Sequence, residues 1–361
     1  MLSRASHDRG QSTALLLFGH HAVMAQPSDS SLSTDSSLFV VWAALLGNLL
    51  VAGTKLAAAG VTGSAALFSE AVHSFVDTGN ELLLLWGIRR AELLPDEVFP
   101  FGHGREVYFW SFVVAMLVFA LGAVVSFFKG VAQITAPSAV ERPTVIFIVL
   151  ALSALFEGAT WLISLRAFRR TGARRSFWRT LRGSKDPPKF MVLLEDSAAL
   201  LGLAIAAVGT WLAVSFDEPR FDGLASVLIG VLLTAVALVL AAKTKDLLIG
   251  ERASPELIQE VMQIVAGFEG VEHANGVLTT QLAPDQVIAI ASIAFADSLT
   301  TPQIEKLVED IETAVIAKRP EIGRLFVKPQ TPQAYDAALK LRFESGVTPA
   351  ARRRRRTKPS G

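Results

Sequence analysis

The chain has 361 residues, of which 51% are hydrophobic and 19% are charged, and its formal net charge is only +1. This composition is typical of a membrane protein with soluble segments attached. Cysteine is absent, which excludes a disulfide framework and any thiolate metal site.

Residues 1–37 are rich in serine and contain one short apolar island at 14–18. This composition predicts a disordered N-terminal tail. A signal peptide is the alternative, because two arginines precede the island, although two histidines interrupt the apolar core that such a peptide needs. Met24 is a second candidate for the translation start.

Six apolar runs of about 20 residues follow, each long enough to cross a bilayer. They cover residues 38–60, 64–88, 107–134, 144–168, 190–215 and 222–243. Basic residues concentrate in the second and fourth connections, 89–106 and 166–189, and are scarce in the others. Because positive residues mark the cytoplasmic side, we expect both termini and these two loops in the cytoplasm. Residues 38–250 are therefore predicted to be an α-helical membrane domain with six transmembrane helices.

Residues 251–330 predict a small cytoplasmic α+β domain. Ser254 and Pro255 are typical of a helix start. In chain order we expect a helix from Pro255 to about Ala266, strands at 276–283 and 287–296, a helix from about Thr301 and a strand at 324–329. This order predicts a ferredoxin-like sandwich with both helices on one face of the sheet. The strand 287–296 is apolar at nearly every position, so it is either covered on both faces or paired with a partner, and we expect a homodimer through this domain.

Residues 331–361 predict a C-terminal helix, at 331–344, and an arginine-rich tail. Arg352 to Arg356 favour a solvated tail on the cytoplasmic side over a dedicated contact with anionic lipid. No aromatic residues interleave with these arginines, so nucleic acid is not an expected partner.

The stretch "LFSEAVHSFVDTGNELLLLWGI", residues 67–88, combines an apolar run with a polar stripe. Glu70, His73, Asp77 and then Asn80 or Glu81 recur at steps of three and four, so they share one helical face. An acid near the bilayer centre costs about 2.5–3.5 kcal/mol on insertion scales, so the stripe needs a compensating partner or a use. His73 and Asp77 lie one turn apart and can share a divalent cation such as zinc.

The fifth apolar run offers a partner for this pair in Glu195 and Asp196. Adjacent residues point about 100° apart on a helix, so we expect only one of the two to face His73 and Asp77. The alternative is a structural carboxylate that pairs with a polar side chain or with the intramembrane Lys55.

Other polar residues inside the runs are expected to be interhelical hydrogen-bond or ion-pair groups, with Glu157 the first to test for function. They are Asn48, Lys55, Glu157 and Asp222. The loop 89–106 holds Asp96 and His103 around a turn rich in proline and glycine. These two residues either form a weaker, peripheral metal site or belong to an ordinary exposed loop.

The six runs, together with "SEAVHSFVDTGN", "FPFGHGRE" and "DGLASVLIG", resemble the cation diffusion facilitators, proton-coupled exporters of zinc, manganese, iron or cobalt. The likeness covers about residues 38–330. Within the family, "VLLEDSAALLG" is most similar to the branch that contains human zinc transporter nine.

The resemblance implies that His73 and Asp77 form one ligand pair of the transport site and that Asp196 belongs to the second pair. The usual fourth ligand falls at Val192, which cannot bind metal, so Glu195 or a water molecule would complete the site. Asp96 and His103 match the loop site of the family, although Phe99 holds the position of another ligand there.

The soluble domain resembles the dimerisation domain of the family, and its one histidine is His273, so a multinuclear zinc cluster is not implied.

The predicted function is export of a divalent metal, with zinc favoured over manganese, iron or cobalt, by alternating access coupled to inward proton movement. Protons compete with a cation for neutral imidazole and ionised carboxylates, which would couple the two flows. We expect the plasma (inner) membrane as the location. No segment resembles a nucleotide-binding loop, so ATP coupling is not expected.

We do not expect an enzyme. An intramembrane metal-dependent hydrolase is a rival that three ligands would permit, but no "HExxH" is present. A membrane-tethered scaffold that has lost transport is a second rival, and Val192 is the kind of change that it would show.

The orientation can be tested with two fusions. A reporter placed after Gly172 should be cytoplasmic, and one placed near Ser138 should be outside, because the basic 166–189 segment stays on the cytoplasmic side. Paired fluorescent and phosphatase reporters measure both positions. Opposite signals would overturn the orientation and with it the predicted direction of transport.

Overall fold

The structure, a computed structural model, describes residues 31–170 and 183–344. The first 30 residues of the predicted tail, residues 171–182 of the basic segment and the terminal arginines lie outside the described residues. The chain divides into a unit up to Gly47, which holds the first half of helix α1 (Ser31–Thr62), and a unit from Asn48 onward.

Helix α1 begins at Ser31, so the last seven residues of the predicted tail, 31–37, are helical. The prediction of disorder was wrong for this segment. Extending an existing helix by one residue is far easier than nucleating a new one, and the apolar run that starts at Leu38 supplies the nucleus.

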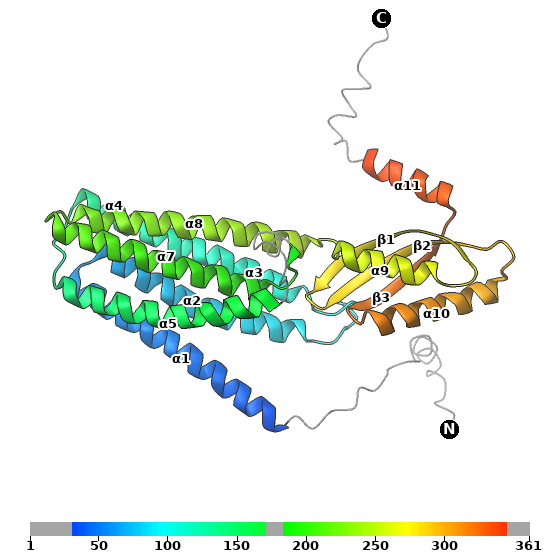
Figure 1. Cartoon of the computed structure of the whole chain (residues 1–361), viewed down its shortest axis with the longest axis horizontal. Helices are drawn as coiled ribbons and strands as arrows, with labels where there is room; N and C mark the ends of the chain where they lie inside the picture. The colour runs from blue at the N-terminus through cyan, green and yellow to red at the C-terminus, as the bar shows by residue number, and fades with distance from the viewer. Residues whose placement is uncertain (1–30, 171–182, 345–361) are drawn as a thin grey trace, which may run out of the picture. The chain divides into compact units, whose positions relative to one another are not determined.

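The unit from Asn48 contains a bundle of long helices (Figure 1). They are α2 (Ala65–Ala91), α3 (Glu106–Leu117), α4 (Val124–Thr135), α5 (Pro143–Arg170), α7 (Pro187–Ser215) and α8 (Arg220–Ile249). A six-residue π-helical segment, η1 (Val118–Ala123), joins α3 to α4, so these three elements form the predicted third run. Helix α2 packs against α3, α7 and α8, while α5 packs on α7 and α4 on α8.

Five stretches of the described chain are long and apolar enough to cross a membrane. They are Leu45–Thr62, Glu106–Thr135, Pro143–Arg166, Pro187–Ser215 and Arg220–Ile249. Helix α2 falls short because its polar stripe lowers its hydropathy and adds charge. Composition thus supports five of the six predicted spans.

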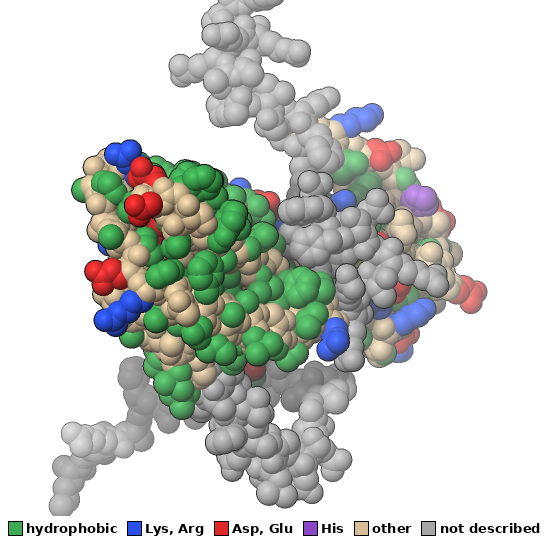
Figure 2. Space-filling view, turned by 60° about the vertical axis from the view of Figure 1, so that its left-hand side comes forward, with side chains coloured by type: hydrophobic (Ala, Val, Ile, Leu, Met, Phe, Trp, Pro, Cys, Tyr) green, Lys and Arg blue, Asp and Glu red, His purple; other side chains and the backbone are tan. Residues whose placement is uncertain are grey.

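The outer surface of the bundle is apolar. Figure 2 shows hydrophobic side chains over most of its visible face, with charged side chains gathered at the left-hand end. Exposed leucines and isoleucines include Leu152, Leu155 and Ile163 on α5 and Leu238 on α8. An apolar surface of this extent is what contact with lipid requires.

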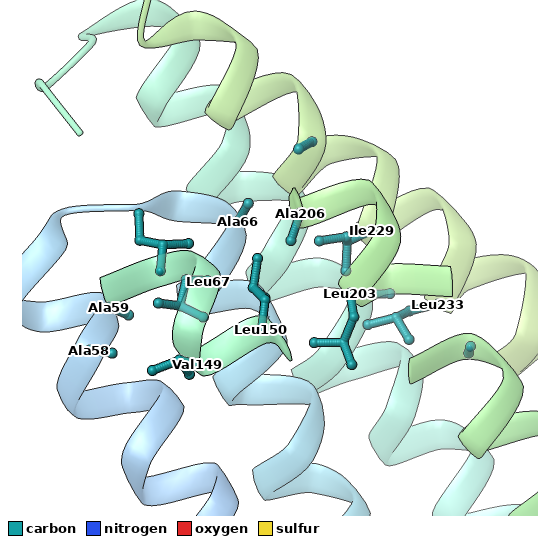
Figure 3. Packing of buried hydrophobic residues seen from close by; sticks show 14 residues of the cluster. Ala58, Ala59, Ala66, Leu67, Val149, Leu150, Leu203, Ala206, Ile229 and Leu233 are labelled. Atoms are coloured by element: carbon teal, nitrogen blue, oxygen red, sulfur yellow. The ribbon is translucent and has the colours of Figure 1, made fainter. Parts of the chain in front are cut away.

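The bundle interior is built from small and branched apolar residues. Figure 3 shows side chains of α1, α2, α5, α7 and α8 in one cluster, with Leu67, Leu150, Leu203 and Ile229 among them. Glycines bring α4 and α8 together. A side chain at Gly130 would come within 2.6 Å of backbone atoms of α8. Such close backbone approach is the usual way in which membrane helices gain packing contacts.

Asp222, at the start of α8, fixes the start of α2. Its Oδ2 accepts hydrogen bonds from the backbone N–H groups of Ala65 (2.5 Å) and Ala66 (3.3 Å), and its Oδ1 accepts one from the Ser64 hydroxyl (2.6 Å). Ser64 is itself the N-cap of α2 and accepts from the N–H of Leu67. The buried carboxylate therefore satisfies helix-end donors that would otherwise lack partners. The prediction that Asp222 is an interhelical hydrogen-bonding group is confirmed.

The remaining elements form a small α+β domain. They are α9 (Pro255–Ala266), β1 (Val271–Ala283), β2 (Gln286–Phe295), α10 (Thr301–Lys318), β3 (Ile322–Pro329) and α11 (Pro332–Glu344). The strands form a sheet in the order β1-β2-β3, with β1 antiparallel and β3 parallel to β2. Side chains of α9 and α10 pack with the apolar side chains of the sheet in one core.

The predicted order of elements in this domain is confirmed. Strand β1 begins at Val271, five residues earlier than expected, because residues with polar side chains also pair with β2. The described sheet has three strands, so the ferredoxin-like assignment stays a prediction.

Replacing the helix-capping acid should destabilise the bundle. Asp222→Ala leaves donors of α2 unpaired in the protein interior, so we expect the free energy of unfolding to fall by about 2 kcal/mol. Thermal unfolding in detergent measures the change. Asp246→Ala, on the exposed face of the same helix, is the control and should alter stability little. Equal melting temperatures for both variants would contradict the assigned role.

Candidate functional site

The polar stripe of α2 faces the bundle interior. His73 is 1% exposed, and its Nδ1 lies 3.4 Å from Asp77 Oδ1. Among the described residues, neither ring nitrogen of His73 nor Asp77 Oδ1 has a hydrogen-bond partner. Buried polar atoms without partners are rare, and each calls for an explanation such as a ligand. A divalent cation held by this imidazole and this carboxylate would satisfy one ring nitrogen and Asp77 Oδ1, and the second ring nitrogen would carry the proton.

A cavity of about 100 Å³ lies beside this pair. Its polar wall consists mainly of acids from α2, α5 and α7, which are Asp77, Glu81, Glu157, Glu195 and Asp196. A volume of this size holds about three water molecules at about 30 Å³ each. The cavity is therefore large enough for a cation that keeps part of its hydration.

The two acids of α7 both line the cavity. Glu195 is buried and accepts a hydrogen bond from Asn80 Nδ2 (3.1 Å), while Asp196 accepts one from the Ser164 hydroxyl (3.0 Å). Both acids therefore border the cavity, while the expectation that only one of them faces His73 and Asp77 stays a prediction. The cavity is bounded by several helices, so two neighbouring positions about 100° apart can both border it.

Val192 also lines the cavity, one turn before Asp196. The position that the resemblance assigns to a fourth ligand therefore presents an apolar side chain to the cavity. His73 is not among the lining residues, although its partner Asp77 is. Within residues 31–170 and 183–344, no three His, Asp or Glu side chains lie close enough to hold one metal ion together. Side chains would have to converge for a cation to gain three protein ligands.

Lys55 lies inside the bundle and forms an interhelical ion pair with Glu157, which confirms the expectation for both residues, although its partners among the described residues are not the acids of α7. Its Nζ is 2.6 Å from Glu157 Oε1, 2.8 Å from the Ser74 hydroxyl and 3.5 Å from Glu70 Oε2. Within the described part of the chain, neither acid of α7 forms a hydrogen bond with Lys55. Glu195 and Asp196 instead accept hydrogen bonds from polar side chains, namely Asn80 and Ser164, as the structural alternative allowed.

Sequence reasoning missed Ser164 as a partner, and it placed Asn80 on the stripe without a role. The sequence signal for both residues is a polar side chain inside an apolar run. Many residues of this chain share that signal, so it does not identify a partner. Asn48, which was expected to make an interhelical contact, donates to Glu81 Oε1 at 2.8 Å. That expectation is confirmed.

The loop residues Asp96 and His103 lie together. His103 Nε2 is 3.1 Å from Asp96 Oδ2, and the Phe99 ring contacts the imidazole with ring centroids 4.6 Å apart. Asp96 Oδ1 accepts hydrogen bonds from the backbone N–H groups of Phe99 (2.6 Å) and Val98 (2.8 Å). The Phe99 hydrogen bond, more than His103, holds the pKa of Asp96 below its ordinary value. The carboxylate thus shapes the turn and leaves one oxygen beside the imidazole.

Comparison with known proteins gives the class of this protein. The sequence profile of the cation efflux transmembrane domain matches residues 41–249, more than half of the chain. The chain therefore belongs to the cation efflux family, also called the cation diffusion facilitators, and is a multi-pass membrane protein.

Individual relatives support the family assignment. The human "Proton-coupled zinc antiporter SLC30A9, mitochondrial" is 33% identical over 242 residues, which cover 66% of this chain and 43% of that protein. "Metal tolerance protein C4" of Arabidopsis thaliana is 29% identical over 261 residues, covering 71% and 56%. The "Cation-efflux pump FieF" of Escherichia coli is 25% identical over 260 residues, covering 72% and 81%. The chain spans less than half the length of the SLC30A9 proteins that it matches.

Proposed function

We propose that this chain exports a divalent transition metal, with zinc as the favoured substrate, in exchange for protons. The observation that carries the proposal is the buried His73 and Asp77 pair, whose donor atoms lack hydrogen-bond partners among the described residues. Imidazole and carboxylate suit zinc and its neighbours among the transition metals. Manganese, iron and cobalt are the alternatives to zinc.

We assign the transport ligands to His73, Asp77 and Asp196. Asp77 and Asp196 line one cavity, which supports their joint use, although the described side chains do not converge on one point. Metal binding would draw Asp196 from its hydrogen bond with Ser164 toward the α2 pair. With Val192 beside the cavity, Glu195 or a water molecule would supply the fourth ligand.

Proton coupling follows from the same donors. A proton on His73 or on a carboxylate removes the lone pair that the metal needs, so metal and protons bind in competition. Release on a proton-rich side and loading on a proton-poor side then require only that the site opens to each side in turn. The name of the human SLC30A9 relative describes a proton-coupled zinc antiporter, which supports this assignment.

We further propose six transmembrane helices, with α2 as the second. Its 27 residues span about 40 Å at 1.5 Å each, and its neighbours α3, α7 and α8 shelter its polar stripe from lipid. The arginine-rich loops support a cytoplasmic location for both termini, because positive residues favour the cytoplasmic side. The SLC30A9 relatives are named as mitochondrial, whereas for this chain we propose the plasma (inner) membrane.

Two further assignments complete the proposal. The domain from residue 251 to residue 330 would join two copies into a homodimer, which rests on its resemblance to the dimerisation domain of the family, because β2 is the central strand and is already largely buried within one chain. Asp96 and His103 would form a weaker, peripheral metal site at the cytoplasmic end. Neither the hydrolase nor the scaffold is favoured, because the family consists of transporters and a scaffold leaves the polar stripe unexplained.

Loss of a transport ligand should stop transport without unfolding the protein. Asp77→Ala and Asp196→Ala each leave two of three protein ligands, so we expect zinc uptake into vesicles to fall to background. His73→Asp keeps a ligand but replaces nitrogen by hard oxygen, which should shift preference toward manganese or iron. The exposed Asp246→Ala is the control and should transport normally. Wild-type uptake by Asp77→Ala at equal protein level would contradict the site.

The role of Glu195 can be decided separately. Glu195→Gln keeps the shape of the side chain and its contact with Asn80 but removes the charge. A large loss of zinc uptake would make Glu195 the fourth ligand beside Val192. Unchanged uptake in the same vesicles would exclude Glu195 and leave that position to water or to another side chain.

A further inference from the structure

Glu157 is an acid of the cavity wall that the transport ligands leave unused. It comes from α5, which supplies none of the assigned ligands, and its side chain is only 13% exposed. Its Oε1 is bound by Lys55, whereas its buried Oε2 has no hydrogen-bond partner in the described part of the chain. Glu157 lines the same cavity as Asp77 and Asp196. One carboxylate oxygen is thus held in place and the other remains available.

Lys55 is the positively charged partner of Glu157. Its ammonium is fully buried and is held by Glu157, Glu70 and Ser74. Glu157 lines the cavity, while Glu70 does not. The ammonium is therefore bound to a carboxylate that a cation in the cavity can reach. An ammonium and a metal ion compete for the same electron density on that carboxylate.

We propose that Glu157 is a further ligand of the translocated cation and that Lys55 competes with this cation for the Glu157 carboxylate. The inference rests on the proposed function. Chemically, the carboxylate would keep Oε1 on Lys55 and offer Oε2 to the metal. Glu157 would supply an oxygen donor where Val192 supplies none, and Lys55 would weaken binding enough to allow release.

A ligand role for Glu157 and a competing role for Lys55 predict opposite changes in zinc affinity on mutation. A purely structural ion pair does not predict this difference. Glu157→Gln removes a ligand, so zinc affinity should fall at least about tenfold. Lys55→Met removes the competing positive charge, so zinc affinity should rise several-fold. Both changes break the same ion pair, so both should lower the melting temperature. A pair that only holds helices together would lower stability in both variants without moving affinity in opposite directions.

Glu70→Gln is the matched control. Glu70 is a fully buried acid on the same ammonium, 3.5 Å from Lys55 Nζ, but it is not among the residues that line the cavity. Its replacement should lower stability and leave zinc affinity close to that of the wild type. Equal losses of zinc affinity in Glu70→Gln and Glu157→Gln would show that both acids only stabilise the bundle, and would overturn the inference.

The experiment is a zinc titration of the full chain in lipid nanodiscs, by competition with a fluorescent chelator, with melting temperatures measured on the same samples. Wild-type affinity in Glu157→Gln, with affinity lost in Asp77→Ala, would overturn this inference and leave the proposed function standing. Wild-type affinity in Asp77→Ala, or no zinc binding by the wild type, would overturn both. A fall in affinity in Lys55→Met would overturn the competition. If that variant does not fold, Glu157→Gln against Glu70→Gln still decides the ligand.

Discussion

Compensation of buried acids is the constraint on which the helical bundle depends. In a low-dielectric interior, an acid without a partner is costly, so each one must find a donor, a cation or a proton. Asp222 is compensated by the start of α2, and Glu70 and Glu157 by Lys55. The contacts of Asp222 and Glu157 join helices that are distant in sequence, whereas Lys55 and Glu70 join the consecutive helices α1 and α2. The helices are therefore aligned by polar contacts as well as by apolar packing.

Two kinds of buried polar group result, and they have different consequences. Both oxygens of the Asp222 carboxylate accept hydrogen bonds, which suits a residue that holds the start of α2 in place. His73 and Asp77 contact each other but have nitrogen and oxygen atoms without hydrogen-bond partners in the described chain, which suits residues that bind a cation. The capping of α2 by Asp222 sets the position of the helix that carries this pair. The structural acid thus positions the pair to which we assign metal binding.

Much of the fold could be predicted because hydropathy and helix signals are local. The run predicted at 190–215 is α7 (Pro187–Ser215), and Ser254 with Pro255 correctly marked the start of α9. The partners of the polar residues could not be predicted. Lys55 and Glu157 are 102 residues apart, and their contact depends on how α1 and α5 meet. For the same reason, sequence spacing did not predict that Glu195 and Asp196 would line one cavity.

We propose that a metal flux and a proton flux run through one set of ligands. Zinc uptake into sealed inside-out vesicles, with an acidic lumen that a protonophore can neutralise, measures the coupling of the two. We expect zinc accumulation that requires the pH gradient and stops when the protonophore collapses it. Accumulation that is independent of the gradient, or no uptake of zinc, manganese, iron or cobalt under any gradient, would exclude proton-coupled export through this site.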